Sequence, residues 1–182
     1  MPTILQRQRD VNCLTISNGG GHMSRAAFSR YIQEVCASRV QFLTFLMGSW
    51  FVSNWAIGLM INHEFPLHST HEMYRASFHA YGVIPVAVNG WHAFFHLATG
   101  IALLIGARTR TNAIRYAAVV ALVYWAMVAV CIGGGMTVCS VMAVDTVGNW
   151  VHGSEGLILA LIAAAGVASG NKSPVTQAVP AS

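Results

Sequence analysis

Four long apolar blocks constrain this chain more than any other feature. They cover about residues 41–61, 86–106, 116–136 and 150–168, and none of them contains a lysine or an arginine. A bilayer core about 30 Å thick is crossed by a helix of about 20 apolar residues. Four such helices in a chain of 182 residues could not bury one another and still leave a water-facing surface. We therefore expect an all-α integral membrane protein, built as a four-helix bundle.

The composition excludes two other classes of protein. Charged residues make up 9% of the chain and hydrophobic residues 55%, whereas about a quarter of the residues in a soluble domain are charged. A disordered chain needs low hydrophobicity and high charge. The basic residues do not form a patch with interleaved aromatic residues, so no nucleic-acid partner is expected. The lipid bilayer is the expected partner, with a homo-oligomer or a larger membrane complex as a further expectation.

The charged residues are sorted between the two sides of the membrane. Asp145, Glu64, Glu72 and a single basic residue, Arg75, lie in the loops that follow the first and third blocks. The other nine of the ten basic residues lie before the first block, between the second and third, or after the fourth: Arg7, Arg9, Arg25, Arg30, Arg39, Arg108, Arg110, Arg115 and Lys172. The positive-inside rule therefore predicts a multi-pass plasma-membrane protein with both termini in the cytoplasm.

The ends of the chain differ from the membrane domain at 39–169. Residues 1–38 are polar and expected to be largely flexible, although residues 24–39 have the apolar spacing of a short amphipathic helix on the membrane surface. Met23 is a candidate alternative start. The tail at 170–182 carries Pro174 and Pro180 and is expected to be disordered.

The second and fourth blocks begin alike. Residues 89–100, NGWHAFFHLATG, align without gaps on residues 145–156, DTVGNWVHGSEG. Both segments run from the outside to the inside, which predicts two parallel repeats of two spans each. Asn89 and Asp145 are good N-cap residues for the two helices. Gly100 and Gly156 permit close contact between helices.

Three histidines and one glutamate are the candidate site residues. His92 and His96 lie one turn apart on one helix face, and His152 is expected at the depth of His96. Glu155 shares a face with His152, where a His–Glu or a His–Asn54 pair would satisfy it. The first interpretation is a buried polar cluster that fixes helix register in a non-enzymatic accessory or structural membrane component. No catalytic residues are predicted, and no cofactor is expected on this interpretation.

Other functions of the same residues stay open. Haem needs imidazoles on facing helices, which His92 or His96 opposite His152 would supply. These histidines together with Glu155 are also suitable ligands for zinc, copper or iron. A third alternative is a proton path in a small proton-coupled transporter, which at this chain length would require a dimer. The spacing alone does not select among them.

The outer loops add two weaker signals. Four of the eight histidines lie between the first and second blocks, namely His63, His68, His71 and His79. An interfacial loop is the preferred interpretation of this group, and a metal-binding patch is the alternative. Cys131 and Cys139 lie on the predicted outer side, where a disulfide is permitted, and their pairing stays open.

One stretch resembles a known family. YGVIPVAVNGWHAFFHLATGIALLIGAR, followed by a third apolar block and VDTVGNWVHGSEGLILALI, is similar to small four-span membrane proteins of unknown function that are common in actinobacteria. The motif is Asn-x-x-His-x-x-x-His-x-x-x-Gly with a weaker echo, here Asn89, His92, His96 and Gly100, then Asp145, Trp150 and His152. The resemblance covers about residues 40–168. It implies four helices and a membrane location, and no established activity or cofactor.

Overall fold

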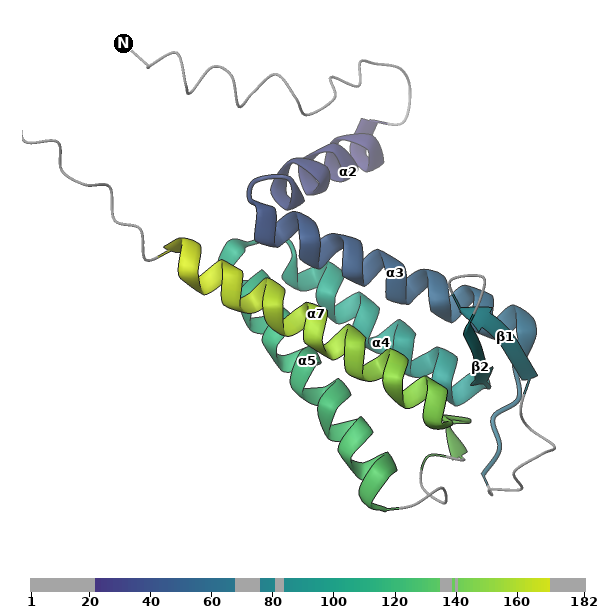
Figure 1. Cartoon of the computed structure of the whole chain (residues 1–182). Helices are drawn as coiled ribbons and strands as arrows, with labels where there is room; N and C mark the ends of the chain where they lie inside the picture. Colours follow the sequence, from purple (N-terminus) through teal and green to yellow (C-terminus); the bar gives the residue numbers. More distant parts are fainter. Residues whose placement is uncertain (1–21, 68–75, 81–83, 135–138, 140, 171–182) are drawn as a thin grey trace, which may run out of the picture.

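The computed structural model describes residues 22–67, 76–80, 84–134, 139 and 141–170 (Figure 1). Its elements are, in chain order, α2 (His22–Val35), α3 (Arg39–Ile61), β1 (Ala76–Ala80), β2 (Ile84–Val88), α4 (Gly90–Gly106), α5 (Arg110–Gly133) and α7 (Thr146–Gly170). The fold is helical, as predicted, with one small antiparallel sheet of β1 and β2 in addition. The tail at 171–182 and most of the polar N-terminal segment, residues 1–21, lie outside the described residues.

Among the described residues, three helices are long and apolar enough to cross a membrane, namely α3, α5 and α7. The helix α4 is apolar but has 17 residues, a length of about 25 Å. Large apolar side chains are exposed on the outside of these helices: Leu122 is 63% and Leu161 is 60% exposed. Such a surface suits lipid and not water. The helices therefore indicate a membrane protein.

The start of α4 differs from the predicted span at 86–106. Residues 84–88 form β2, and the helix begins at Gly90. Pro85 interrupts any helix that would continue through it, and the following valines favour a strand. Asn89 then caps the helix, since its side-chain oxygen accepts a hydrogen bond from the backbone N–H of His92 at 3.1 Å.

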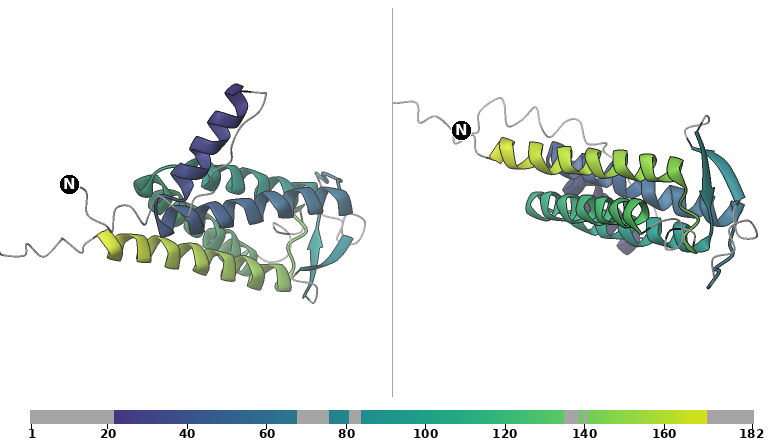
Figure 2. Two further views of the ribbon diagram at one scale, coloured as in Figure 1. Left: turned by 90° about the horizontal axis from the view of Figure 1, so that it is seen from above. Right: turned by 60° about the horizontal axis from the view of Figure 1, so that its bottom comes forward.

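The helices pack closely as α3 against α4 and α5 against α7 (Figures 1 and 2). A Cβ atom on Gly48 of α3 would lie 3.0 Å from the backbone oxygen of Gly100 in α4. A Cβ atom on Gly156 of α7 would lie 2.7 Å from the indole nitrogen of Trp125 in α5. A Cβ atom on Gly100 would itself lie 2.9 Å from Cγ2 of Val52 and 3.0 Å from the backbone oxygen of Gly48. Glycine at positions 100 and 156 therefore permits the close approach of the helices.

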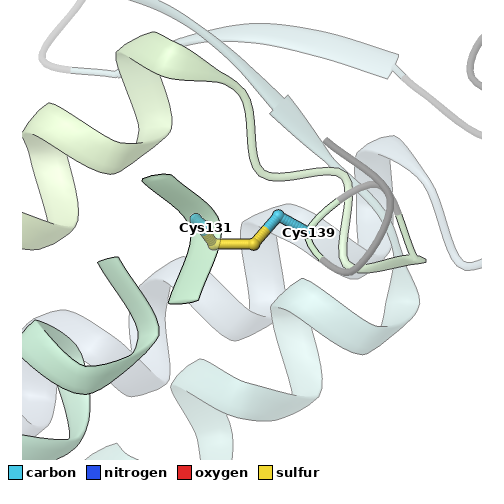
Figure 3. The surroundings of a disulfide bond; sticks show 2 residues. All are labelled: Cys131 and Cys139. Atoms are coloured by element: carbon cyan, nitrogen blue, oxygen red, sulfur yellow. A yellow bond between two sulfur atoms is a disulfide. The ribbon is translucent and has the colours of Figure 1, made fainter. Parts of the chain in front are cut away.

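The two ends of the helices are chemically different. The start of α3, the turn from α4 to α5 and the end of α7 lie together at one end, and the β hairpin lies at the other (Figures 1 and 2). Arg39 and Arg110 are the first residues of α3 and α5, and both are at the first end. The disulfide between Cys131 and Cys139 is at the hairpin end, where it ties the last turn of α5 to the segment before α7 (Figure 3). The Cα atoms of this disulfide are 5.4 Å apart.

The N-terminal helix α2 projects from the basic end of the molecule (Figure 2). The Tyr31 hydroxyl donates a hydrogen bond to the carbonyl oxygen of Leu104 at 2.9 Å, and Arg108 Nε donates to Glu34 Oε2 at 2.8 Å. The hydrogen bond from Arg108 lowers the pKa of the Glu34 carboxyl. Phe28 is 61% exposed on this helix. The short helix expected at residues 24–39 is therefore present as α2, and polar contacts dock it against the helices that follow.

Candidate metal centre

Three buried histidines meet between α4 and α7. His92 and His96 lie one turn apart on α4, and His152 lies in the second turn of α7. Their exposed fractions are 5%, 6% and 1%. The Nε2 atoms of His92 and His152 are 3.1 Å apart, and one ring nitrogen from each of the three residues lies within 4.8 Å of the others. The fold thus brings together all three histidines that the sequence singles out in the spans.

The distance between the two Nε2 atoms matches two ligands of one metal ion. Two imidazole nitrogens bound to a tetrahedral ion at about 2.05 Å lie about 3.3 Å apart. The observed separation of 3.1 Å is close to that value. A direct hydrogen bond between His92 and His152 has the same length, and it requires one ring to donate and the other to accept. The geometry therefore permits both arrangements.

Tyr124 of α5 orients the third imidazole. Its hydroxyl lies 3.1 Å from Nδ1 of His96 and 3.3 Å from Oγ1 of Thr99. Phe51 of α3 stacks on the Tyr124 ring, with centroids 5.0 Å apart and planes 8° from parallel. Because Nδ1 of His96 is engaged by Tyr124, Nε2 is the nitrogen available to a ligand. A metal-binding histidine commonly uses its second nitrogen in this way.

Glu155 has a different partner from the predicted one. Its Oε1 accepts a hydrogen bond from the indole N–H of Trp50 at 3.0 Å, and its side chain is 1% exposed. Within the part of the chain that the structure describes, Oε2 of Glu155 and Nδ1 of His152 are buried and lack a hydrogen-bond partner. An unsatisfied buried polar atom costs about 1–3 kcal/mol. The cluster therefore contains polar groups that the protein alone does not satisfy.

These side chains line one small cavity. His92, His96, His152 and Glu155 contribute to its wall together with Trp50. The space open to the centre of a water molecule is about 30 Å³. One water molecule needs about 10–15 Å³ of such space. The cavity therefore holds a metal ion with one small ligand, or about two water molecules.

The N-terminal ends of α4 and α7 are fixed by the two predicted caps. Asn89 is fully buried, and its Nδ2 donates a hydrogen bond to the carbonyl oxygen of Val141 at 2.7 Å. Asp145 Oδ1 accepts from the backbone N–H of Gly148 at 2.7 Å. Asn89 thereby joins the helix that carries His92 to the segment that precedes α7. The caps position the histidines and do not line the cavity.

Sequence reasoning missed the aromatic partners of the site. Trp50, Phe51 and Tyr124 all lie in apolar blocks, where aromatic residues are typical of both the core and the lipid interface. A buried tyrosine hydroxyl usually finds a hydrogen-bond partner, and this was the available signal for Tyr124. Its partner, however, is on another helix, and the sequence does not show which helices are neighbours.

The four histidines between the first and second apolar blocks do not join the cluster as far as the structure describes them. His63 is exposed. The placement of His68 and His71 and the side chain of His79 lie outside the described residues. Among the described residues, the group of candidate metal ligands consists of His92, His96 and His152. The predicted alternative of a metal patch in this loop thus stays a prediction.

Comparison with known families then places the chain. Residues 41–165 match the family described as a domain of unknown function, DUF4383. The chain belongs to this family. The resemblance to a family of unknown function is thus confirmed, and no curated protein or solved structure matches the chain. The DUF4383 region contains His92, His96, His152, Tyr124 and Glu155, whereas α2 precedes it.

Proposed function

We propose that this DUF4383 protein is a multi-pass membrane protein that binds one transition-metal ion through His92, His96 and His152. The observation that carries the proposal is the convergence of three buried imidazoles within 4.8 Å. Histidines are rare in membrane spans and mark functional sites by default. Imidazole ligands favour zinc, copper, iron or nickel over magnesium or calcium. The protein has no catalytic role in this proposal.

Metal binding explains the cluster better than a structural role alone. A polar cluster that only fixes helix register gains most when every buried polar atom has a partner. Oε2 of Glu155 is without one among the described residues. A bound metal ion engages the facing ring nitrogens directly, and its charge stabilises the nearby carboxylate. We therefore place the accessory or structural role second to metal binding.

Haem fits the cavity poorly. The space of about 30 Å³ accommodates water-sized ligands, whereas sites for organic ligands of drug size occupy about 300–1,000 Å³. Two axial imidazoles bind one haem iron from opposite sides. Their two ligating nitrogen atoms are therefore about 4 Å apart, the sum of two metal–nitrogen bonds of about 2 Å. The 3.1 Å between His92 and His152 is shorter than this span. The geometry favours a mononuclear ion without a porphyrin.

The proton-coupled transporter is the weaker alternative. Such a carrier needs a polar route from the cluster to both faces of the membrane. Leu103 lies two turns inward from His96, and Leu159 lies two turns inward from His152. Both side chains are fully buried in the apolar core. This packing favours a site that is closed toward the basic end.

We further propose that the four helices span the plasma membrane as two parallel repeats, α3 with α4 and α5 with α7. The basic end, with Arg39 and Arg110, lies in the cytoplasm in agreement with the positive-inside rule. The disulfide at the opposite end supports this orientation, because disulfides persist in oxidising compartments. The exposed apolar faces provide surface for a homo-oligomer. Measuring the mass of the protein in detergent tests this.

Metal content is the direct test of the proposed function. The protein is purified in detergent without a chelator or an affinity tag of histidines, and its metal content is measured by mass spectrometry. Binding of Co²⁺ is then followed by visible absorption. We expect one metal ion per chain, and we expect His92→Ala, His96→Ala and His152→Ala each to lower the affinity for Co²⁺ by more than about 100-fold.

His63→Ala is the matched control, since His63 is an exposed histidine of the outer loop. It should leave the affinity for Co²⁺ unchanged. A folded protein that binds neither Co²⁺ nor Zn²⁺ would refute the proposal. Equal losses of thermal stability in the three metal-free histidine variants, without any metal binding by the unmodified protein, would favour the structural role instead.

A further inference from the structure

The proposed metal centre lacks one protein ligand of a closed site. Structural zinc sites have four protein ligands, whereas sites that bind an additional molecule have three and keep one position open. Among the described residues, three histidines form the group whose ligand atoms lie within 4.8 Å of one another, and Glu155 is not a member of it. The carboxylate is nevertheless in the wall of the same cavity. It is therefore beside the centre without being part of its ligand set.

The Glu155 carboxylate is held so that one oxygen remains available. Trp50 donates its indole N–H to Oε1 at 3.0 Å, which fixes the side chain. Oε2 is buried and without a hydrogen-bond partner in the described part of the chain. The cavity, about 30 Å³ in all, has room for one small ligand beside the metal ion. An unpartnered acceptor beside a water-sized space indicates a ligand that donates a hydrogen bond.

Charge leads to the same ligand. Three neutral imidazoles leave the full charge of a divalent ion in a membrane interior, where an uncompensated charge is costly. Glu155 is the only acidic residue within the four helices. A water molecule bound to the metal becomes a stronger hydrogen-bond donor, and Oε2 is an acceptor beside it. The carboxylate thus compensates the ion through the bound water.

We infer that the metal centre carries an exchangeable small ligand, a water molecule or hydroxide, held between the ion and Oε2 of Glu155. This inference rests on the proposed function. The open position makes the site a binding centre for small monodentate ligands, in contrast to a metal that only joins helices. Glu155 is a positioning residue for that ligand.

Azide binding to the Co²⁺-loaded protein tests the inference. We expect azide to change the visible absorption of bound Co²⁺, because it replaces the water. Glu155→Gln retains an oxygen that accepts from Trp50 and presents an N–H donor in place of Oε2. This variant should bind Co²⁺ about tenfold to 100-fold more weakly, because the charge that compensates the ion is lost while the three imidazoles remain, and its Co²⁺-loaded form should bind azide about tenfold more tightly. Glu64→Gln, which changes an exposed outer glutamate, should alter neither affinity.

Each outcome of the test is decisive. Unchanged absorption at a large excess of azide would show a closed site and overturn the inference. A loss of Co²⁺ affinity of more than about 100-fold in Glu155→Gln would make Glu155 a metal ligand and also overturn it. Failure of the unmodified protein to bind Co²⁺ would refute the proposed function itself.

A measurement on the unmodified protein keeps the inference testable if Glu155→Gln does not fold. Pulsed electron paramagnetic resonance of the Cu²⁺-loaded protein in D₂O detects deuterons of a water molecule bound to the metal. We expect such deuterons, together with nitrogen couplings from the imidazoles. Nitrogen couplings without exchangeable deuterons would overturn the inference.

Discussion

Tyr124→Phe tests whether His96 is held for metal binding. The change removes one hydroxyl, which lies 3.1 Å from Nδ1 of His96. The ring itself stays, and so does its stacking on Phe51 at a centroid distance of 5.0 Å. Any effect therefore reports the hydrogen bond and not a packing defect.

The expected loss of metal affinity is tenfold to 100-fold, about 1.4–2.7 kcal/mol, which is typical when the partner of a ligating histidine is removed. In Tyr124→Phe, Nδ1 of His96 is buried without the hydroxyl partner in both the metal-free and the metal-bound protein. That cost cancels from the binding equilibrium. The remaining effect comes from the looser ring orientation and the lower basicity of the ligand nitrogen.

The assay is competition for Co²⁺ or Zn²⁺ against a chelator of known affinity in the same detergent. Thr99→Val is the matched control, because Thr99 lies 3.3 Å from the same hydroxyl and does not contact a ring nitrogen of His96. It should change the affinity less than about twofold. An affinity of Tyr124→Phe equal to that of the control would refute the assigned role of Tyr124 in positioning His96.

Three further changes test other parts of the fold. Gly48→Ala should lower the free energy of unfolding by about 1–3 kcal/mol, since its Cβ would lie 3.0 Å from the Gly100 backbone oxygen. Gly153→Ala is the control and should not lower it, because a Cβ atom there meets nothing within 4 Å. Arg108 lowers the pKa of Glu34 below its ordinary value of 4.5, so the ion pair contributes fully above that pH and is lost as the pH falls through the lowered pKa. The protection of the α2 amides, that is, their exchange rate relative to the intrinsic rate at the same pH, should therefore fall as the pH falls through the lowered pKa of Glu34. Glu34→Gln should have lower protection at neutral pH and lose this dependence, and protection that does not change with pH in the unmodified protein would contradict the contact. Cys139→Ser should lower stability by about 2.5 kcal/mol under oxidising conditions and not under reducing conditions, and equal effects in both would exclude the disulfide.

The sequence predicts the helices well because the bilayer leaves few alternatives. A long apolar stretch without charges has to satisfy its backbone groups internally, and a helix does this within one segment. The caps at Asn89 and Asp145 are also local, because each side chain bonds to a backbone N–H three residues ahead. The strand at Ile84–Val88 was missed since apolar valines suit a helix in lipid and a strand equally. Only its pairing with β1 decides between them.

The histidines of the site could be found from the sequence because a polar side chain in an apolar block is exceptional. The contacts of these histidines could not be found from the sequence. His92 faces His152 across a gap of 60 residues, and Trp50 reaches Glu155 across 105 residues. Periodicity identifies the face of one helix, whereas these contacts depend on the rotation and the order of several helices. The sequence therefore predicts a histidine partner for Glu155 that the packing does not provide.

The depth of the cluster decides the side from which a metal ion reaches it. His92 lies in the first turn of α4 and His152 in the second turn of α7, so the cluster is about 5–10 Å below the hairpin ends of these helices. About 20–25 Å of apolar helix then separates it from the basic end. In sealed vesicles of known orientation, Zn²⁺ added at the hairpin side should load the site faster than Zn²⁺ added at the basic side, as read by protection against heat unfolding. Equal rates from both sides, or faster loading from the basic side, would contradict this, because an ion would then have to pass the buried leucines at 103 and 159.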